Sequence, residues 1–254
     1  MTVPTGVPFP PIAALGDGNL GGDGWGYGFT AGVTLTPTPT TTVGLGYRSA
    51  INQKISGTLA LPAQLGGSFA ANTTLNLPDM VSLGIRQRID PQWTLLGTME
   101  WTNWSRIGTS VISASLPPGI PTQTLPFQYK DGWLFSVGAE YQASDRLTLR
   151  SGFGYEISPI SDSVRTPVIP DNDRFWASVG ASYQIWQGLT ANLAYSHLFV
   201  RSTSVNISAA SGNPWFNGIT YVGDVQAHVD ILSIGLKIRW DEPSAPVTSK
   251  LIIK

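Results

Sequence analysis

Residues 81–101 read VSLGIRQRIDPQWTLLGTMEW, and apolar and polar side chains alternate on both sides of a central Asp-Pro-Gln segment. Successive side chains of a β-strand point to opposite faces of a sheet, so this pattern predicts two strands that each have one apolar face. The apolar face carries Val81, Leu83, Ile85, Ile89, Trp93, Leu95, Met99 and Trp101. The opposite face carries Arg86, Arg88 and Glu100 among small polar residues. Asp-Pro-Gln is typical of a tight turn between antiparallel strands.

The same alternation recurs along the rest of the chain and marks about nine strands. Two of the clearest run from Trp133 to Gln142 and from Leu147 to Glu156. Each strand is close to or above the ~9–11 residues with which a tilted strand crosses a bilayer. Soluble β-sandwiches also alternate on their core face, but their strands are shorter and their surfaces carry more charge.

Charged residues are scarce, because they make up 12% of the 254 residues whereas a soluble domain has ~25%. The chain contains 28 Gly and 19 Pro, and 10% of its residues are aromatic, a composition that suits strands and turns. The formal net charge of −1 argues against nucleic-acid binding, and the absence of cysteine removes disulfides and thiol catalysis. No run approaches the ~18 apolar residues of a membrane helix.

Aromatic side chains gather toward the ends of the apolar faces: Trp93, Trp101, Trp133, Tyr141, Tyr155 and Tyr183. The two lipid–water interfaces favour such rings at both ends of an apolar band. The sequence therefore predicts an all-β fold, an antiparallel transmembrane β-barrel whose apolar face contacts lipid and whose polar face lines a lumen. We expect the following residues to face lipid: Leu83, Leu95, Trp101, Val137, Leu149, Phe153 and Val179.

Short turns and long loops alternate along the chain. The turns are TPTPTTT, DPQ, SDR and Gln187-Gly188, and the loops lie near residues 60–77, 115–127, 158–173 and 208–218. Outer-membrane barrels alternate tight periplasmic turns with longer outside loops in this way, and they usually have an even number of strands. About nine strands are therefore expected to be part of a larger barrel. In this interpretation residues 1–24 belong to an extracellular loop, residues 25–242 to barrel strands and loops, and residues 243–254 to a C-terminal tail.

Five segments carry a further signal: GDGWGYGF (22–29), VGLGYRS (43–49), LPDMVSLGI (77–85), WTLLGTMEWTNWS (93–105) and RTPVIPDNDRFW (165–176). Together and in this order they resemble segments of the FadL family of outer-membrane transporters for long-chain fatty acids and aromatic hydrocarbons. The resemblance implies a barrel of about fourteen strands with an N-terminal hatch in the lumen, and this chain matches the C-terminal part.

The resemblance also implies an integral protein of the bacterial outer membrane that is monomeric when full length and needs no cofactor. Its partners would be hydrophobic small molecules, fatty acids or aromatic hydrocarbons, and outer-membrane lipid. Two features depart from the family: the opening MTVPTGVPFPP lacks the regions of a signal peptide, and the tail DEPSAPVTSKLIIK stands where such barrels usually end on an aromatic residue. We therefore expect a truncated barrel.

Charged residues at inward positions are the candidate ligand-facing groups: Arg48, Arg86, Arg88, Glu100, Arg106, Glu140, Arg150, Glu156, Lys237 and Arg239. Charges in a lumen need partners or water, so one interpretation is a ladder of ion pairs that stiffens the wall. The other is that one or two arginines bind a fatty-acid carboxylate, which a guanidinium matches with two hydrogen bonds. The sequence leaves both interpretations open.

The loop near residues 158–173 gives a second candidate site, formed by Arg165, Asp171, Asp173 and Arg174. A calcium ion on the two aspartates would want further oxygen ligands, so Asp–Arg pairing that closes the loop is favoured. Apolar loop residues offer either a landing surface at the mouth or packing between loops: Leu116, Ile120, Leu125, Phe127, Trp215 and Phe216.

Catalysis has little support in the sequence. His197 and His228 are the only histidines, and Ser196 and His197 are neighbours on a strand, so their side chains point to opposite faces. The glycines of residues 22–28 lie in an alternating stretch without a following helix, which favours close approach by a plug or ligand over a phosphate loop. We therefore expect a channel and no enzyme, with a general porin or a structural barrel as the alternatives.

Overall fold

The computed structural model describes residues 2–3, 18–61, 67–116 and 123–240. These residues form β-strands and one short 3-10 helix, η3 (Trp104–Ile107). No helix among them is long and apolar enough to cross a membrane. The strands make three sheets, and every described strand pair is antiparallel. The predicted all-β antiparallel fold is confirmed.

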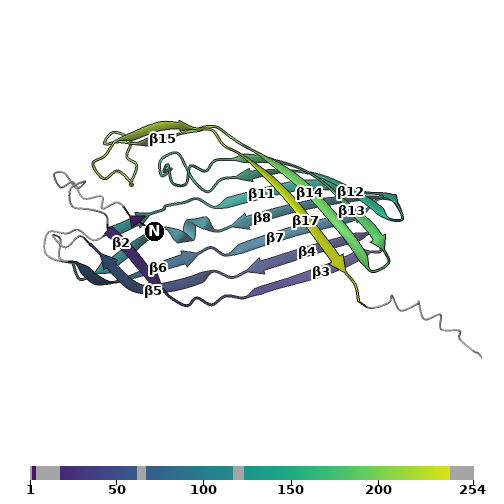
Figure 1. The fold of residues 1–254 in the computed structure, drawn as a ribbon, viewed down its shortest axis with the longest axis horizontal. Coiled ribbons are helices and arrows are strands. Elements are labelled where there is room, and N and C mark those ends of the chain that lie inside the picture. Colours follow the sequence, from purple (N-terminus) through teal and green to yellow (C-terminus); the bar gives the residue numbers. More distant parts are fainter. Residues whose placement is uncertain (1, 4–17, 62–66, 117–122, 241–254) are drawn as a thin grey trace, which may run out of the picture.

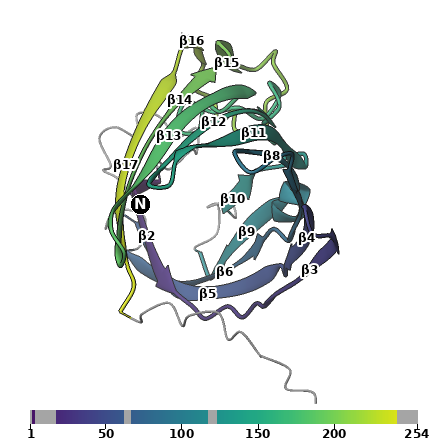
Figure 2. The ribbon, with the colours of Figure 1, turned by 90° about the vertical axis from the view of Figure 1, so that its right-hand side faces the viewer.

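A nine-stranded sheet forms the wall of the barrel (Figure 1). In spatial order its strands are β17 (His228–Ile238), β14 (Leu189–Val200), β13 (Arg174–Trp186), β12 (Leu147–Ile157), β11 (Gly132–Ser144), β8 (Trp93–Thr102), β7 (Met80–Arg88), β4 (Thr41–Arg48) and β3 (Thr30–Thr38). Figure 2 shows that this wall is strongly curved. The predicted count of about nine strands is confirmed, and the four predicted short turns lie at one end, which we call the turn end.

At the opposite end, the loop end, strands continue beyond the wall into a second sheet of six strands. It consists of β1 (Thr2–Val3), β2 (Gly18–Asp23), β5 (Ile51–Ala60), β6 (Ser68–Leu77), β9 (Thr109–Ala114) and β10 (Gln123–Pro126). Two loop predictions were therefore wrong in extent: residues 60–77 include β6, and residues 115–127 include β10. Ladders with β5 and β9 satisfy the backbone groups of these segments, and a cluster around Leu59, Ala71 and Ile112 packs between them.

A hairpin of β15 (Thr203–Ile207) and β16 (Tyr221–Val225) completes the loop end. Strand β2 lies inside the segment that was predicted to be an N-terminal loop, residues 1–24, whereas the predicted tail, residues 243–254, lies outside the described residues.

The two faces of the wall differ in side-chain size and exposure. On one face, Val137 and Phe153 are opposite each other in the ladder and are each 66% exposed. On the other face, Ser182 and Leu198 are 8% and 3% exposed. Side chains splay apart on the convex side of a curved sheet and converge on the concave side, so the large apolar side chains lie outside. The predicted alternation is confirmed for all seven residues expected on the lipid side.

The glycines of residues 22–28 do not lie in one strand as predicted, because β2 ends at Asp23 and β3 begins at Thr30. The expected close approach is present, but a neighbouring strand makes it. A Cβ atom on Gly24 would lie 1.9 Å from the carbonyl oxygen of Lys54 on β5, so only glycine fits against that backbone.

Strands β3 and β17 are the edges of the wall, and each has one neighbour within the described residues. Neighbouring strands alternate in direction, so the first and the ninth strand run the same way, from the loop end to the turn end. Direct pairing of these edges would be parallel. An antiparallel closure of the wall needs an odd number of additional strands.

Candidate functional site

A chain of polar contacts crosses the concave face of the wall. Glu140 accepts a hydrogen bond from Arg86 Nη2 at 3.1 Å on one carboxylate oxygen and from Arg150 Nε at 2.8 Å on the other. Arg150 Nη1 also donates to Ser182 Oγ, and Ser182 donates to Asn192 Oδ1 at 2.6 Å. The sequence predicted the three charged residues as inward groups, and Ser182 and Asn192 extend the line of polar contacts to β14.

Arg86 and Glu140 meet across an intervening strand. In the ladders Arg86 lies opposite Leu96 and Glu140 lies opposite Thr94, and both of these partners belong to β8. Neighbouring strands are ~4.8 Å apart, so the ion pair bridges about twice that spacing. Side chains reach that far when they converge over the concave face, which places both charges in the lumen.

A hollow of about 470 Å³ lies on the concave face over β11, β12 and β13, and we call it the lumenal hollow. Its floor is made of residues with a small side chain or none: Ser136, Gly138, Gly152, Gly154, Ser178, Gly180 and Ala194. Larger side chains border it: Leu96, Leu134, Trp176 and Arg150. The result is a mainly apolar surface with one guanidinium, that of Arg150, toward its turn end.

Toward the loop end, Glu156 and Trp176 border the lumen. Trp176 Nε1 donates to Glu156 Oε2 at 3.1 Å. Arg174 Nε lies 3.4 Å from the same oxygen, an ion-pair distance without hydrogen-bond geometry. Arg174 Nη2 donates to Asp171 Oδ1 at 2.7 Å, so one guanidinium pairs with two carboxylates and the three side chains carry a net charge of −1.

The candidate loop site is closed by contacts within the protein. Asp173 accepts hydrogen bonds from the Tyr155 hydroxyl and from the Ser158 amide, each at 2.9 Å. Asp171 accepts one from the Ser158 hydroxyl at 2.6 Å in addition to its pairing with Arg174. The part of the chain that the structure describes holds no group of three His, Asp or Glu residues suited to a metal ion.

Arg165, the fourth residue of the candidate loop site, is 1% exposed. It pairs with Asp162 and donates to the carbonyl of Asp171 at 2.9 Å and to that of Ser204 at 3.4 Å. Asn213 Nδ2 in turn donates to the Arg165 carbonyl at 3.1 Å. A buried guanidinium without such partners would be costly, and with them it joins the 158–173 loop to the β15 hairpin.

The remaining predicted residues are spread along the wall. Arg48, Glu100 and Lys237 lie on the concave face, where the described residues offer them no ion pair. Arg88 Nη2 donates to the Pro39 carbonyl at the turn end at 3.3 Å. Arg239 follows β17 and its amide donates to the Gly188 carbonyl at 2.8 Å.

Arg106 was wrongly assigned to an inward strand position. Strand β8 ends at Thr102, and Arg106 lies in the following 3-10 helix, where its Nε is 3.0 Å from Asp79 Oδ1. Alternation predicts a facing only while the chain stays extended, and the helical turn interrupts it.

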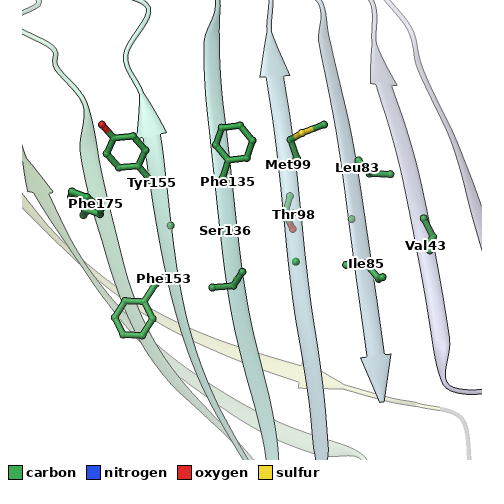
Figure 3. Close-up of a pocket in the computed structure, with 14 residues that line it drawn as sticks. Val43, Leu83, Ile85, Thr98, Met99, Phe135, Ser136, Phe153, Tyr155 and Phe175 are labelled. Carbon is green, nitrogen blue, oxygen red and sulfur yellow. The ribbon is translucent and has the colours of Figure 1, made fainter. Parts of the chain in front are cut away.

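A second hollow lies on the convex face, and we call it the outer hollow (Figure 3). Large apolar side chains from neighbouring strands surround it, among them Leu83, Met99, Phe135, Phe153 and Phe175. It opens on the apolar band that a transmembrane barrel presents to lipid acyl chains, so it belongs to the lipid-facing surface.

The predicted separation of Ser196 from His197 is confirmed. Ser196 shares a 2.8 Å hydrogen bond with Ser178 on the concave face. His197 Nδ1 lies 2.7 Å from Asp230 Oδ1 on the convex face, so the two side chains cannot act on one substrate.

Aromatic residues mark the loop end of the wall. Trp101 Nε1 donates to Asp131 Oδ2 at 3.0 Å. Burial tends to raise the pKa of Asp131, but hydrogen bonds from Ser105 and Trp101 outweigh it and hold that pKa below its usual value. Further out, the rings of Phe127 and Trp215 meet edge to face with centroids 5.8 Å apart.

The apolar loop residues mainly pack against one another. Leu116 and Leu125 pack against the apolar cluster of the six-stranded sheet, and Phe127 contacts Trp215. Ile120 lies outside the described residues. These contacts favour packing between loops over an open landing surface for Leu116, Leu125, Phe127 and Trp215.

Sequence reasoning missed the lumenal hollow. Gly138, Gly152 and Gly180 recur at inward positions, but they come from three strands, and only the register places them side by side. A signal was present in the inward face of each strand, where glycine and serine replace the larger polar residues expected of a water-filled lumen.

A family model described as "Outer membrane protein transport protein (OMPP1/FadL/TodX)" matches residues 6–240. The chain belongs to this family. It is therefore an integral β-barrel protein of the outer membrane, as the resemblance implied.

Individual relatives agree with this assignment. The chain is 28% identical over 181 residues to the "Long-chain fatty acid transport protein" of Escherichia coli K12, covering 69% of this chain and 40% of that protein. The crystal structure of a Pseudomonas aeruginosa FadL homologue matches with a TM-score of 0.73 at 25% identity, covering 83% of this chain and 52% of the other.

The Pseudomonas putida toluene transporter TodX shares the fold, with a TM-score of 0.59 at 17% identity over 92% of this chain and 57% of TodX. The chain thus spans about half the length of these family members.

Proposed function

We propose that this FadL-family chain is part of a channel for the passive uptake of hydrophobic compounds, such as long-chain fatty acids, across the outer membrane. The observation that carries the proposal is the lumenal hollow, an apolar surface beside the guanidinium of Arg150. A molecule with an acyl chain and a carboxylate matches both parts, because the chain covers apolar surface and the carboxylate accepts hydrogen bonds from arginine.

The proposed route runs from the loop end to the turn end. At the loop end lies a rim where the guanidinium of Arg174 pairs with both Glu156 and Asp171 and offsets part of their negative charge. Beyond it, Trp176 and Leu134 border the hollow, and Arg150 lies roughly 13 Å further along, four residues from Trp176 in the β12–β13 register. The solute follows its concentration gradient, so the channel needs no cofactor and performs no reaction.

Among the predicted inward charges, we assign the ligand carboxylate to Arg150 and its neighbour Arg86. Glu140 pairs with both arginines, and the remaining charged residues stabilise the wall or its ends in this proposal: Arg48, Arg88, Glu100, Arg106, Glu156, Lys237 and Arg239. We propose the same structural role for Arg165, Asp171, Asp173 and Arg174, whose hydrogen-bonding groups are used within the loops. The complete protein would act as a monomer surrounded by outer-membrane lipid.

A matched pair of substitutions on β14 tests the proposal. Ala194 lies on the floor of the lumenal hollow, and Ala191, opposite Tyr183 and Leu236, lies on the convex face. In a complete barrel that contains this chain, Ala194→Leu fills the hollow and should lower oleate uptake several-fold, whereas Ala191→Leu should leave it unchanged. Equal uptake by the two variants contradicts the proposal.

Electrolyte conductance in planar bilayers separates a hydrophobic channel from a water-filled porin. A porin would conduct ions steadily and take up small sugars, and Ala194→Leu would reduce both. We expect low ion conductance together with oleate uptake.

A further inference from the structure

The lumenal hollow ends at two arginines that share one carboxylate. Arg86 and Arg150 both contact Glu140, at 3.1 Å and 2.8 Å. These three side chains, which we call the charge triad, carry a net charge of +1. The nearest further members of the polar chain, Ser182 and Asn192, are neutral.

The triad keeps unused hydrogen-bonding capacity toward the lumen. Arg86 uses only Nη2, and Arg150 uses Nε and Nη1, in the contacts among the described residues. The side chains of Arg86 and Arg150 are 55% and 43% exposed, whereas that of Glu140 is 22% exposed. The positive groups are therefore more accessible to a solute than the negative group that they share.

Glu140 has the same chemical group as the head of a fatty acid. Each guanidinium that pairs with Glu140 offers fewer donors and less uncompensated charge to a second carboxylate. A ligand carboxylate at Arg150 therefore competes with Glu140. A channel needs binding that is strong enough for entry and weak enough for exit, and an internal competitor lowers affinity for the charged head without changing the apolar floor.

We infer that Glu140 is an internal competitor for the carboxylate of the transported molecule and sets its rate of release from Arg86 and Arg150. The inference rests on the proposed function. It assigns to Glu140 control of affinity and release, and it confines that control to solutes with an anionic head. Uncharged solutes of the same chain length occupy the same hollow, and their affinity and release rate do not depend on Glu140.

The main test is equilibrium binding of oleate and of oleyl alcohol to the purified complete barrel that contains this chain, here called the natural protein, and to its variants. Glu140→Gln should tighten oleate binding roughly tenfold, because it frees both guanidinium groups, and leave oleyl alcohol binding within about twofold. Uptake of oleate at saturating concentration should fall, because release becomes slow. Glu100→Gln is the matched control, since Glu100 lies on the same face and contacts no member of the triad in the described residues; it should change neither ligand's binding.

A double variant distinguishes the effect of removing the competing carboxylate from the effect of changing the net charge. It also provides a test if Glu140→Gln fails to fold because two arginines lose their partner. Arg86→Gln with Glu140→Gln keeps the net charge of +1 and leaves Arg150 without a competing carboxylate. Competition predicts that this variant binds oleate more tightly than the natural protein. Equal or weaker oleate binding in the double variant, or in Glu140→Gln, overturns the inference and leaves the proposed function standing if both ligands still bind. Failure of the natural protein to bind either ligand overturns both.

Discussion

The two hollows of this barrel wall are separated only by the thickness of the same strands. The outer hollow is surrounded by Phe135, Phe153 and Phe175, and the lumenal hollow is floored by glycine, serine and alanine. A single step along β12, from Phe153 to Gly154, moves from one surface to the other. Exposed apolar surface therefore has two roles in this fold: on the convex face it contacts lipid, and on the concave face we propose that it offers a path for a solute.

The two hollows have different environments only if the wall separates lipid from lumen, so closure of the wall has the largest expected effect. The chain by itself should give oleate uptake no higher than background, because β3 and β17 cannot pair with each other in antiparallel fashion. A version that carries the additional strands of a full-length relative should transport. Both proteins are exported with a signal peptide, and oleate uptake and heat-modifiable gel mobility are measured for each. Equal uptake by the two proteins would refute the need for closure of the wall.

A charge placed on the convex face should destabilise the barrel more than a charge placed on the concave face. Val137 lies in the middle of β11 on the convex face, so Val137→Arg should destabilise the completed barrel by about 2–4 kcal/mol. Ser136→Arg, one residue earlier on the concave face, should cost less than about 1 kcal/mol because its side chain reaches water in the lumen. Denaturant unfolding in lipid vesicles measures both, and a reversed order would mean that the faces are assigned the wrong way round.

Depth along the convex face should give a smaller effect. Leu149 is on the same face as Phe153 but only two residues from the turn end of β12. Leu149→Arg therefore costs the full ~2–4 kcal/mol only if that position lies near the bilayer midplane, and the position in the strand predicts a lower cost. The same vesicle unfolding experiment compares it with Phe153→Arg, and a higher cost at Leu149 would show that the barrel sits deeper than its strand ends indicate.

The smallest expected effect on stability comes from adding one methyl group in each hollow by a Gly→Ala substitution. On Gly97 of the outer hollow, a Cβ atom would lie 3.1 Å from Ile85 Cγ2, and that side chain can move. On Gly138 of the lumenal hollow it would lie 3.1 Å from the Ser151 carbonyl oxygen, which is fixed in the ladder. Gly97→Ala should stabilise the barrel by up to about 1 kcal/mol, and Gly138→Ala should stabilise it less or destabilise it. Unfolding curves of the two variants that coincide would show that the wall relaxes equally at both sites.

The alternation of residues 81–101 was sufficient to predict two strands, their turn and the face of each side chain. This worked because a side-chain period of two follows from the extended backbone itself. It failed where the backbone leaves that geometry, at Arg106 in the 3-10 helix and at the glycines between β2 and β3. It also missed β6 and β10, because their pairing beyond the wall depends on neighbours that are distant in sequence.

The sequence by itself determined the nine-stranded wall, its lipid-facing surface and most of the inward charges, because each depends on the local order of apolar and polar residues. Only the tertiary structure decided which charges meet. Arg86 reaches Glu140 across β8, and Gly138, Gly152 and Gly180 form one floor, because curvature and register bring together side chains from separate strands. Contacts of that kind are long-range, so no window of the sequence contains both partners.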